Sequence, residues 1–191
     1  MHDAIVRAID SGEVCALVLL DLRSAFDKVD HDTLLHVMNQ RFGIDGPALA
    51  WFGSYLADRT QVFHYDTQRS GPHTVNCSVP QGSVLGPKEF IVYTEELTEL
   101  IDGYQLGHHL YADDTQLVKS TRIIDIMPII QTLQQCIEAI HKWCASRRLQ
   151  LNPSKTDIVW FGTKASLKKM ENADLSLHVR NDVIEPVSVV R

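Results

Sequence analysis

The chain has 191 residues, of which 45% are hydrophobic and 22% are charged. These proportions are typical of a folded globular protein, and they exclude a disordered, collagen-like or coiled-coil chain. Its 24 acidic and 18 basic residues give a formal net charge of −6. No overall basic field therefore attracts nucleic acid, and such binding would need a local basic patch. At this length we expect one domain, or a part of a larger protein.

Cysteine spacing and the N-terminal sequence indicate an intracellular protein. The four cysteines form no C-x-x-C pattern, and a chain of this size needs no disulfide framework. Acidic residues stand near the N-terminus where a signal peptide would be basic, and the apolar run at residues 14–20 is far shorter than the ~20 residues that span a bilayer. We therefore expect a cytoplasmic or nuclear protein that does not interact with a membrane.

The first predicted element is a strand at residues 14–20. Its sequence, VCALVLL, shows no alternation, as in a strand that is covered on both faces, and it ends at Asp21. Asp30 can cap a helix that ends at Gly43. A second helix is predicted to begin at Asp45, with a proline in its first turn.

Turn residues and apolar spacing predict the next elements. Residues 61–65 and 74–79 flank the turn signal Ser70-Gly71-Pro72, which predicts a hairpin. Residues 84–101 are predicted to form one helix, in which Pro87 is tolerated only because it falls in the first turn.

The second half of the chain is predicted to contain strands on either side of a long helix. Two short strands, 105–112 and 115–119, join at Asp113-Asp114. Residues 158–161 are a further strand, and residues 175–190 read as a hairpin around Asn181-Asp182. Between them, apolar residues step by three and four and mark an amphipathic helix ending near Arg147. These residues are Ile130, Leu133, Ile137, Ile140 and Cys144.

This order predicts an α+β fold. Without residues 30–80, the elements run strand, helix, strand, strand, helix, strand, which is the ferredoxin-like split βαββαβ unit. In that topology the third strand lies antiparallel between the first two, so Asp21 and the Asp113-Asp114 turn share one edge of the sheet. Singly, each aspartate is more often an ordinary turn residue. Carboxylates brought together repel one another and persist mainly where cations such as Mg²⁺ neutralise them.

Four segments in order resemble the reverse transcriptases of non-LTR retrotransposons, which share a polymerase palm with group II intron and retroviral enzymes. They are ALVLLDLRSAFDKVDH at 16–31, VPQGSVLGP at 79–87, LYADDTQL at 110–117 and LNPSKT at 151–156. The resemblance implies a palm domain over residues 1–191, with a partial fingers/palm helical insertion at about 30–80. It also implies that the fingers are largely absent from the chain, that the thumb is absent, and that a longer polyprotein supplies them.

The resemblance implies a metal site of carboxylates. Asp21 and Asp113 match the residues that hold two Mg²⁺ ions, for which Mn²⁺ can substitute, and Asp114 matches the adjacent third acid. Leu22 would offer its backbone carbonyl as a further oxygen ligand. Two such ions can activate a primer 3′-hydroxyl and stabilise the leaving pyrophosphate.

Four further residues receive roles from the resemblance. Phe26 matches a steric gate that rejects a 2′-hydroxyl; without the resemblance, core packing is an equal interpretation. Gln81 and Gly82 match the loop that contacts the nucleotide and template, where glycine allows close backbone approach. Lys155 matches a lysine that protonates or orients pyrophosphate; an isolated lysine would more often be a surface residue.

The function implied is that of an RNA-directed DNA polymerase, a nucleotidyltransferase that uses deoxynucleoside triphosphates, an RNA template and a DNA primer. One alternative is a catalytically inactive remnant that acts as a binding or scaffold module. Another is a different two-metal or cyclase enzyme on the same fold. Lys88-Glu89 departs from the family, in which apolar residues usually follow the Gly-Pro pair. Template contacts by the following helix are therefore in question.

Overall fold

The computed structural model describes residues 2–187 and divides the chain into two compact units. The first contains the residues up to Arg23, Glu96–Ser146 and the residues from Gln150 onward, and we call it the sheet unit. The second contains Ser24–Glu95 with Arg147–Leu149, and we call it the helical unit. The expected strand residues 188–190 lie outside the described residues.

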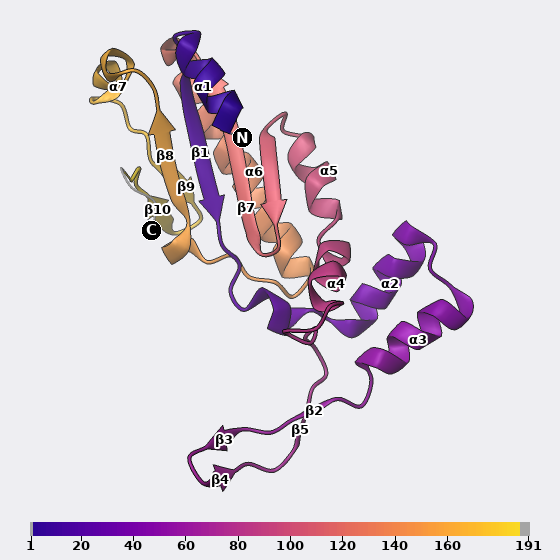
Figure 1. The fold of residues 1–191 in the computed structure, drawn as a ribbon. Helices are drawn as coiled ribbons and strands as arrows, with labels where there is room; N and C mark the ends of the chain where they lie inside the picture. The colour runs from indigo at the N-terminus through magenta and orange to yellow at the C-terminus, as the bar shows by residue number, and fades with distance from the viewer. Residues whose placement is uncertain (1, 188–191) are drawn as a thin grey trace. The chain divides into compact units, whose positions relative to one another are not determined.

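A four-stranded antiparallel sheet forms the centre of the sheet unit (Figure 1). Its order is β6-β7-β1-β8, and each neighbouring pair is antiparallel. β7 therefore lies between β1 and β6, which run parallel to each other, and the predicted placement of the third strand is confirmed. The strands are β1 (Val14–Leu20), β6 (Gly107–Tyr111), β7 (Asp114–Thr121) and β8 (Asp157–Phe161).

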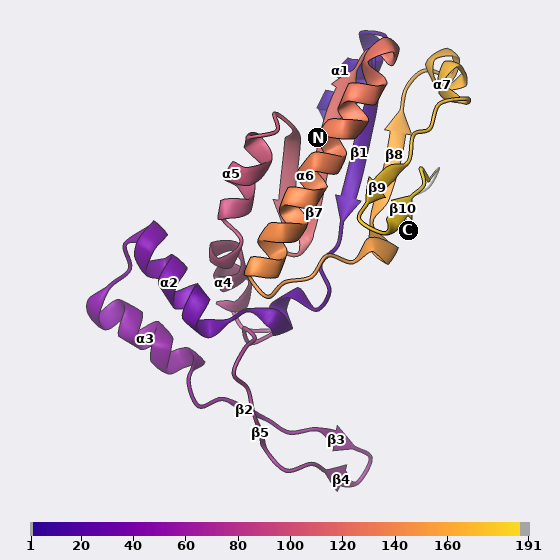
Figure 2. The same cartoon turned by 180° about the vertical axis from the view of Figure 1, so that it is seen from behind.

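Helix α6 (Ile126–Ser146) covers one face of the sheet (Figure 2). On that face Val18 of β1 pairs with Leu117 and Ile158 of its two neighbours, and all three are fully buried. The five apolar residues expected to form the helix stripe are all buried, which confirms the predicted periodicity. By length and composition, Ile123–Ser146 could also cross a membrane, although this stripe packs in the core here.

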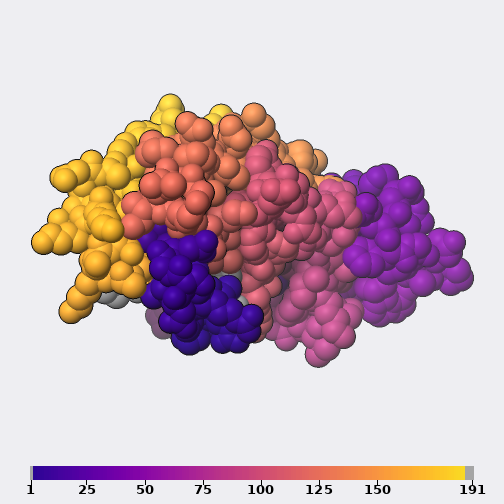
Figure 3. All heavy atoms as spheres, turned by 90° about the horizontal axis from the view of Figure 1, so that it is seen from above, coloured from indigo at the N-terminus to yellow at the C-terminus, as the bar shows by residue number. Residues whose placement is uncertain are grey.

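The opposite face of the sheet is covered only in part. Helix α1 (His2–Asp10), which the sequence analysis did not predict, packs on β1 and β7 and is exposed on its outer side (Figure 3). It lies near the start of β1, so among the described residues of the sheet unit no helix lies over this face at the end of β1 next to Asp21 (Figure 1). The remaining elements of the unit are α5 (Glu96–Asp102), α7 (Lys164–Met170), β9 (Leu177–Val179) and β10 (Asp182–Ile184).

The helical unit is built from α2 (His31–Phe42), α3 (Gly46–Leu56) and α4 (Gly86–Tyr93). Asp30 caps α2 as predicted, because its Oδ1 accepts a hydrogen bond of 3.0 Å from the N–H of Thr33. Its Oδ2 lies 2.6 Å from Nη1 of Arg148. Gly43 ends α2 with a φ of 64°, also as predicted.

The single helix expected at residues 84–101 is two helices. α4 ends at Tyr93 and α5 begins at Glu96. At the break, both the N–H and the hydroxyl of Thr94 donate to the carbonyl of Phe90, each at 3.0 Å. A threonine hydroxyl that competes for a helix carbonyl favours a bend or an end. The apolar spacing did not reveal this local competition.

The hairpin in the helical unit turns at a different place from the one predicted. The chain reverses at residues 66–67, where Asp66 has a φ of 52°, a conformation that Asp tolerates well. Ser70, expected in the turn, lies in the returning arm and exchanges hydrogen bonds with Phe63. The strands are β2 (Thr60–Gln61), β3 (His64–Tyr65), β4 (Gln68–Arg69) and β5 (His73–Thr74), and residues 75–79 form no strand.

Glu89 on α4 is a buried acid in the helical unit. It is 1% exposed, and neither carboxyl oxygen has a hydrogen-bond partner among the described residues. Burial raises the pKa of Glu89, and the charges of Arg59 and His31 oppose this rise. A raised folded-state pKa means that the folded protein binds more protons than the unfolded one above about pH 4.5, so stability falls as pH rises through that range.

We therefore expect Glu89→Leu to stabilise the protein at pH 7.5 by about 1–3 kcal/mol, because it removes an unpaired polar group from the core. The gain should shrink as the pH falls toward 4.5, because protonation of Glu89 in the folded state removes the cost of burying its charge. Urea unfolding at pH 5 and 7.5 measures both effects. The exposed Glu171→Gln serves as the control and should change little. A gain independent of pH would show that Glu89 is not titrating in the core.

Candidate active site

Asp21 and Asp114 line the same pocket at one end of the sheet. The last registered pair of β1 and β7 is Leu20 with Thr115, and one further step brings Asp21 opposite Asp114. Leu20 and Thr115 are both buried on the face beneath α6. Side chains alternate along a strand, so the two aspartates lie on the open face. They line one pocket of about 580 Å³ together with Lys155.

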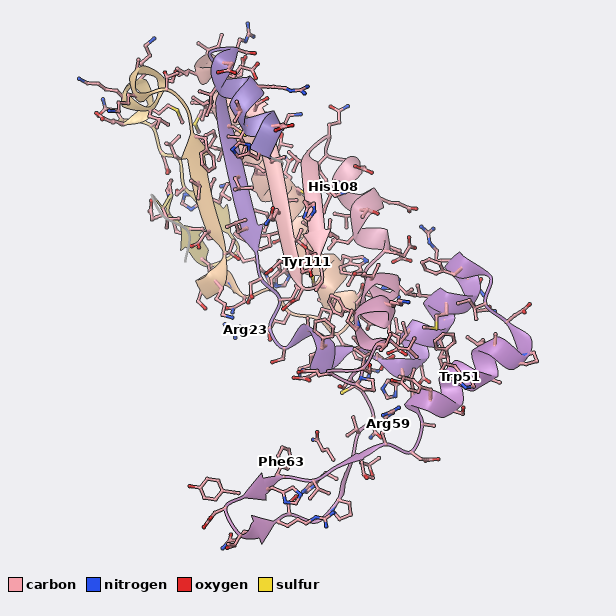
Figure 4. All side chains as sticks on the ribbon, viewed as in Figure 1. Arg23, Trp51, Arg59, Phe63, His108 and Tyr111 are labelled. Carbon is pink, nitrogen blue, oxygen red and sulfur yellow. The ribbon has the colours of Figure 1, made fainter. Side chains whose placement is uncertain are left out.

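Asp113 lies at the turn between β6 and β7 and is not among the pocket residues. The turn begins one residue earlier than expected: Ala112 adopts a φ of 53°, and Asp114 already belongs to β7, paired with Tyr111. Tyr111 is labelled at this end of β6 in Figure 4. Within residues 2–187, no three His, Cys, Asp or Glu side chains are grouped closely enough to hold a metal ion. The structure thus brings two of the three aspartates into one pocket.

Leu22 follows Asp21 and forms an isolated bridge with Leu151. The hydrogen bonds of this bridge are made by the neighbours of Leu22: the carbonyl of Asp21 accepts from Asn152, and the N–H of Arg23 donates to Gln150. Leu22 and Leu151 themselves therefore form a non-hydrogen-bonded antiparallel pair. In such a pair the residue's own carbonyl points away from the partner strand. The Leu22 carbonyl is therefore not used by the bridge, and it could serve as an oxygen ligand.

Lys155 reaches the same carboxylate from the loop that precedes β8. Its Nζ lies 3.6 Å from Oδ2 of Asp21, and its side chain is 67% exposed. An exposed ion pair of this kind contributes little stability, typically ~0.2–1 kcal/mol. The ammonium group thus provides a positive charge beside Asp21 but is held there only weakly.

Asn152 is the residue of this site that the sequence analysis missed. Its Nδ2 donates to Oδ2 of Asp21 at 3.0 Å, and its backbone N–H donates to the carbonyl of Asp21 at 2.9 Å. The only sequence signal was its position in the LNPSKT segment. Nothing local predicts a partner 131 residues away.

The oxygen atoms at this end of the sheet are suitable ligands for a hard divalent cation. Two carboxylates and a backbone carbonyl are oxygen ligands of the kind that Mg²⁺ prefers, and Mg²⁺ completes its shell with water or phosphate oxygens. The pocket is open, and a positive charge already lies beside Asp21. The described residues therefore supply part of a coordination shell.

The other predicted site residues belong to the helical unit. Phe26 is partly buried, and its ring stacks on Phe90 with the centroids 4.7 Å apart. Gln81 is exposed and donates from Nε2 to Oδ1 of Asp27 at 2.9 Å. Gly82 has a φ of 77°, which a residue with a side chain would adopt only under strain.

The loop that carries Gln81 and Gly82 is held by short polar contacts. Ser83 Oγ donates to the Pro80 carbonyl at 2.7 Å and accepts from the N–H of Gly86 at 2.9 Å. A side chain at Gly86 would come within 2.7 Å of the Pro80 carbonyl oxygen. Glycine is therefore required where this loop enters α4.

Residues 3–175 match the family described as "Reverse transcriptase (RNA-dependent DNA polymerase)", and the chain belongs to this family. The chain is 32% identical over 157 residues to a probable RNA-directed DNA polymerase from transposon BS of Drosophila melanogaster, and 28% identical over 166 residues to the polymerase of the mobile element jockey from the same fly. These similarities confirm the resemblance to reverse transcriptases of non-LTR elements.

The matched region is a small part of those relatives. It covers 80% and 83% of this chain but 17% and 18% of the two fly proteins. A solved structure of apo telomerase from Candida tropicalis, truncated from its C-terminal domain, is similar with a TM-score of 0.63 at 13% identity, over 84% of this chain and 33% of that one. The likeness supports a shared mixed helix-and-strand fold.

We expect Lys155→Ala to increase the affinity for Mn²⁺ about threefold to fivefold, because unit charges ~4 Å apart in water interact by about 1 kcal/mol. Electron paramagnetic resonance of free Mn²⁺ during titration measures this affinity. Lys168→Ala, at an exposed lysine of α7, should leave it unchanged. Unchanged or weaker binding by Lys155→Ala would show that the ammonium group does not compete with a cation.

Proposed function

We propose that the chain is the palm of an RNA-directed DNA polymerase, with a ferredoxin-like split βαββαβ core. It would transfer nucleotides from deoxynucleoside triphosphates to the 3′-hydroxyl of a DNA primer along an RNA template. The observation that carries the proposal is the pocket that Asp21, Asp114 and Lys155 share, just beyond the last registered pair of β1 and β7.

Asp21, Asp113, Asp114 and the Leu22 carbonyl are the proposed ligands of two Mg²⁺ ions, or of Mn²⁺ in their place. When bound, these ions supply the charge that activates the 3′-hydroxyl and neutralises the leaving pyrophosphate. Asp21 and Asp114 already share the pocket. Asp113 lies at the adjacent turn, so a change in that turn would be needed to bring it to the same ions.

The remaining roles concern the nucleotide. Lys155 would contact the developing negative charge of pyrophosphate, for which an exposed and weakly paired ammonium group is suited. Phe26 would lie against the sugar and exclude a 2′-hydroxyl, supported from behind by Phe90. Gln81 and Gly82 would contact the nucleotide and template from an exposed loop whose shape is fixed by Ser83.

The partners proposed are an RNA template, a DNA primer and deoxynucleoside triphosphates, bound inside the cell in the cytoplasm or nucleus. With a net charge of −6, the chain needs other basic segments to hold a nucleic-acid duplex. The curated relatives that it matches are several times longer, so we propose that fingers and thumb segments of a larger polyprotein supply those contacts.

Glu89 favours a second candidate function, that of an inactive remnant retained as a binding or scaffold module. Glu89 is a buried acid with no hydrogen-bond partner in the part of the chain that the structure describes, and such a residue costs stability. This loss of stability is more easily tolerated in a protein whose core no longer has to hold an active site in place. The two candidates make opposite predictions for catalysis.

We expect the longest reading frame that contains this chain to extend oligo-dT on poly-rA with Mg²⁺, and the 191-residue chain to extend it barely. Positioning of the primer end can contribute ~7–11 kcal/mol to catalysis, and much of it would come from parts outside the palm. A gel-based extension assay at low salt measures this. Asp21→Asn in the full frame should lower the rate more than about a hundredfold, which corresponds to several kcal/mol of lost charge stabilisation.

Asp182→Asn provides a matched control, because Asp182 is exposed on β10 and lies outside the Asp21 pocket. It should leave extension unchanged. A full frame that fails to extend at all favours the remnant. Equal extension by Asp21→Asn and its parent would instead remove Asp21 from the catalytic site.

We expect Phe26→Ala, in the same full frame, to lower the discrimination between deoxyribonucleotides and ribonucleotides at least about tenfold, because the ring would exclude the 2′-hydroxyl by its bulk. The ratio of kcat/KM values for the two nucleotides measures this. Phe26→Tyr keeps the ring and should keep the ratio. If Phe26→Ala retains the parent ratio, the ring serves only to pack against Phe90.

A further inference from the structure

Asn152 uses every polar group it has at the junction between β1 and the loop that leads to β8. It is 7% exposed. Its N–H donates to the carbonyl of Asp21, and its own carbonyl accepts from the N–H of Lys155 and the hydroxyl of Thr156, each at 3.1 Å. The backbone bridge between Leu22 and Leu151 fixes the same junction.

The side-chain amide of Asn152 can take only one orientation in this setting. Its Oδ1 accepts from Oγ of Ser154 at 2.7 Å and from Nε of Arg23 at 3.3 Å. Arg23 lies just beyond the end of β1 (Figure 4). Because hydroxyl and guanidinium donors both face Oδ1, the NH₂ group must face Asp21, where it donates to Oδ2 at 3.0 Å.

We infer that Asn152 is the positioning residue for the Asp21 carboxylate. It holds Oδ2 and thereby presents Oδ1 to a divalent cation in the pocket shared with Asp114. The inference rests on the proposed function, since it assigns Asn152 to the same metal site. Asn152 acts through Asp21 and touches no reacting atom, so it is not a catalytic residue.

Lys155 cannot perform this task, although it approaches the same oxygen. Its Nζ is 3.6 Å from Oδ2, on a flexible side chain that is 67% exposed. Asn152 is buried and held by donors on both sides of its Oδ1. If Lys155 leaves to contact a phosphate, the hydrogen bond from Asn152 still fixes Asp21.

Exchange of the two side chains tests the contact itself. Asn152→Asp replaces the donor with a carboxylate beside Oδ2 of Asp21, and it should lower the Tm of the 191-residue chain by about 5 °C. The double variant Asp21→Asn with Asn152→Asp restores one donor and one carboxylate, so it should recover most of that loss. If the double variant is as unstable as the sum of its single variants, the two side chains do not interact and the inference fails.

Mn²⁺ affinity tests the positioning role. Mutation of residues that orient metal ligands typically weakens binding ~10–100-fold. We expect Asn152→Ala to raise the Kd for Mn²⁺ about tenfold while circular dichroism remains native. Ser154→Ala is the matched control: it removes one donor to Oδ1 but keeps the bond to Asp21, and its Kd should stay within about twofold of the parent's, since the Arg23 contact to Oδ1 remains.

Asp21→Asn separates the inference from the proposed function. If it abolishes Mn²⁺ binding while Asn152→Ala binds as the parent does, the positioning role is wrong and the metal site stands. If Asp21→Asn binds Mn²⁺ unchanged, the proposed metal site is wrong and the inference fails with it. In the full frame, a raised Mg²⁺ requirement for Asn152→Ala with kcat retained at saturating Mg²⁺ supports positioning, because a merely structural defect would lower kcat at every concentration.

Discussion

The antiparallel register between β1 and β7 is the constraint on which the site depends. Leu20 pairs with Thr115, and this single alignment places Asp21 beside Asp114 on the open face. If either strand slipped by one residue, its own side chains would change faces and its carboxylate would lie beneath α6. The register is secured by apolar residues such as Val18 and Leu117, which α6 covers. The core therefore determines where the charged groups stand, although it contains none of them.

Regular elements with long apolar patterns could be predicted from the sequence. The run at Val14–Leu20 and the stripe of α6 form as expected, because burial of many apolar side chains outweighs local preferences. The break at Thr94 and the turn at Asp66 depend on one hydroxyl and one left-handed residue. Such single contacts are worth about 1 kcal/mol, which is too little to show in a spacing pattern.

The candidate site likewise contains one part that could be predicted from the sequence and one part that could not. That Asp21 and the Asp113-Asp114 turn meet at one edge of the sheet follows from topology, so the order of strands was enough to predict it, whereas the exact turn decides that Asp114, not Asp113, shares the pocket with Asp21. The role of Asn152 could not be predicted, because its partners Asp21 and Arg23 come from the other end of the chain. A buried amide has no periodicity and no characteristic neighbours in sequence. Only the folded structure shows which of its two ends faces which partner.

Two residues of one loop act on one oxygen of Asp21 with different strengths. Asn152 is buried and saturated with hydrogen bonds, whereas Lys155 is exposed and makes a long ion pair. Because the N–H of Lys155 donates to the carbonyl of Asn152, both belong to a single short turn at residues 152–155. A divalent cation at Asp21 would repel the lysine but not the amide. The same turn can therefore keep Asp21 in place while Lys155 is free to move toward an anionic group.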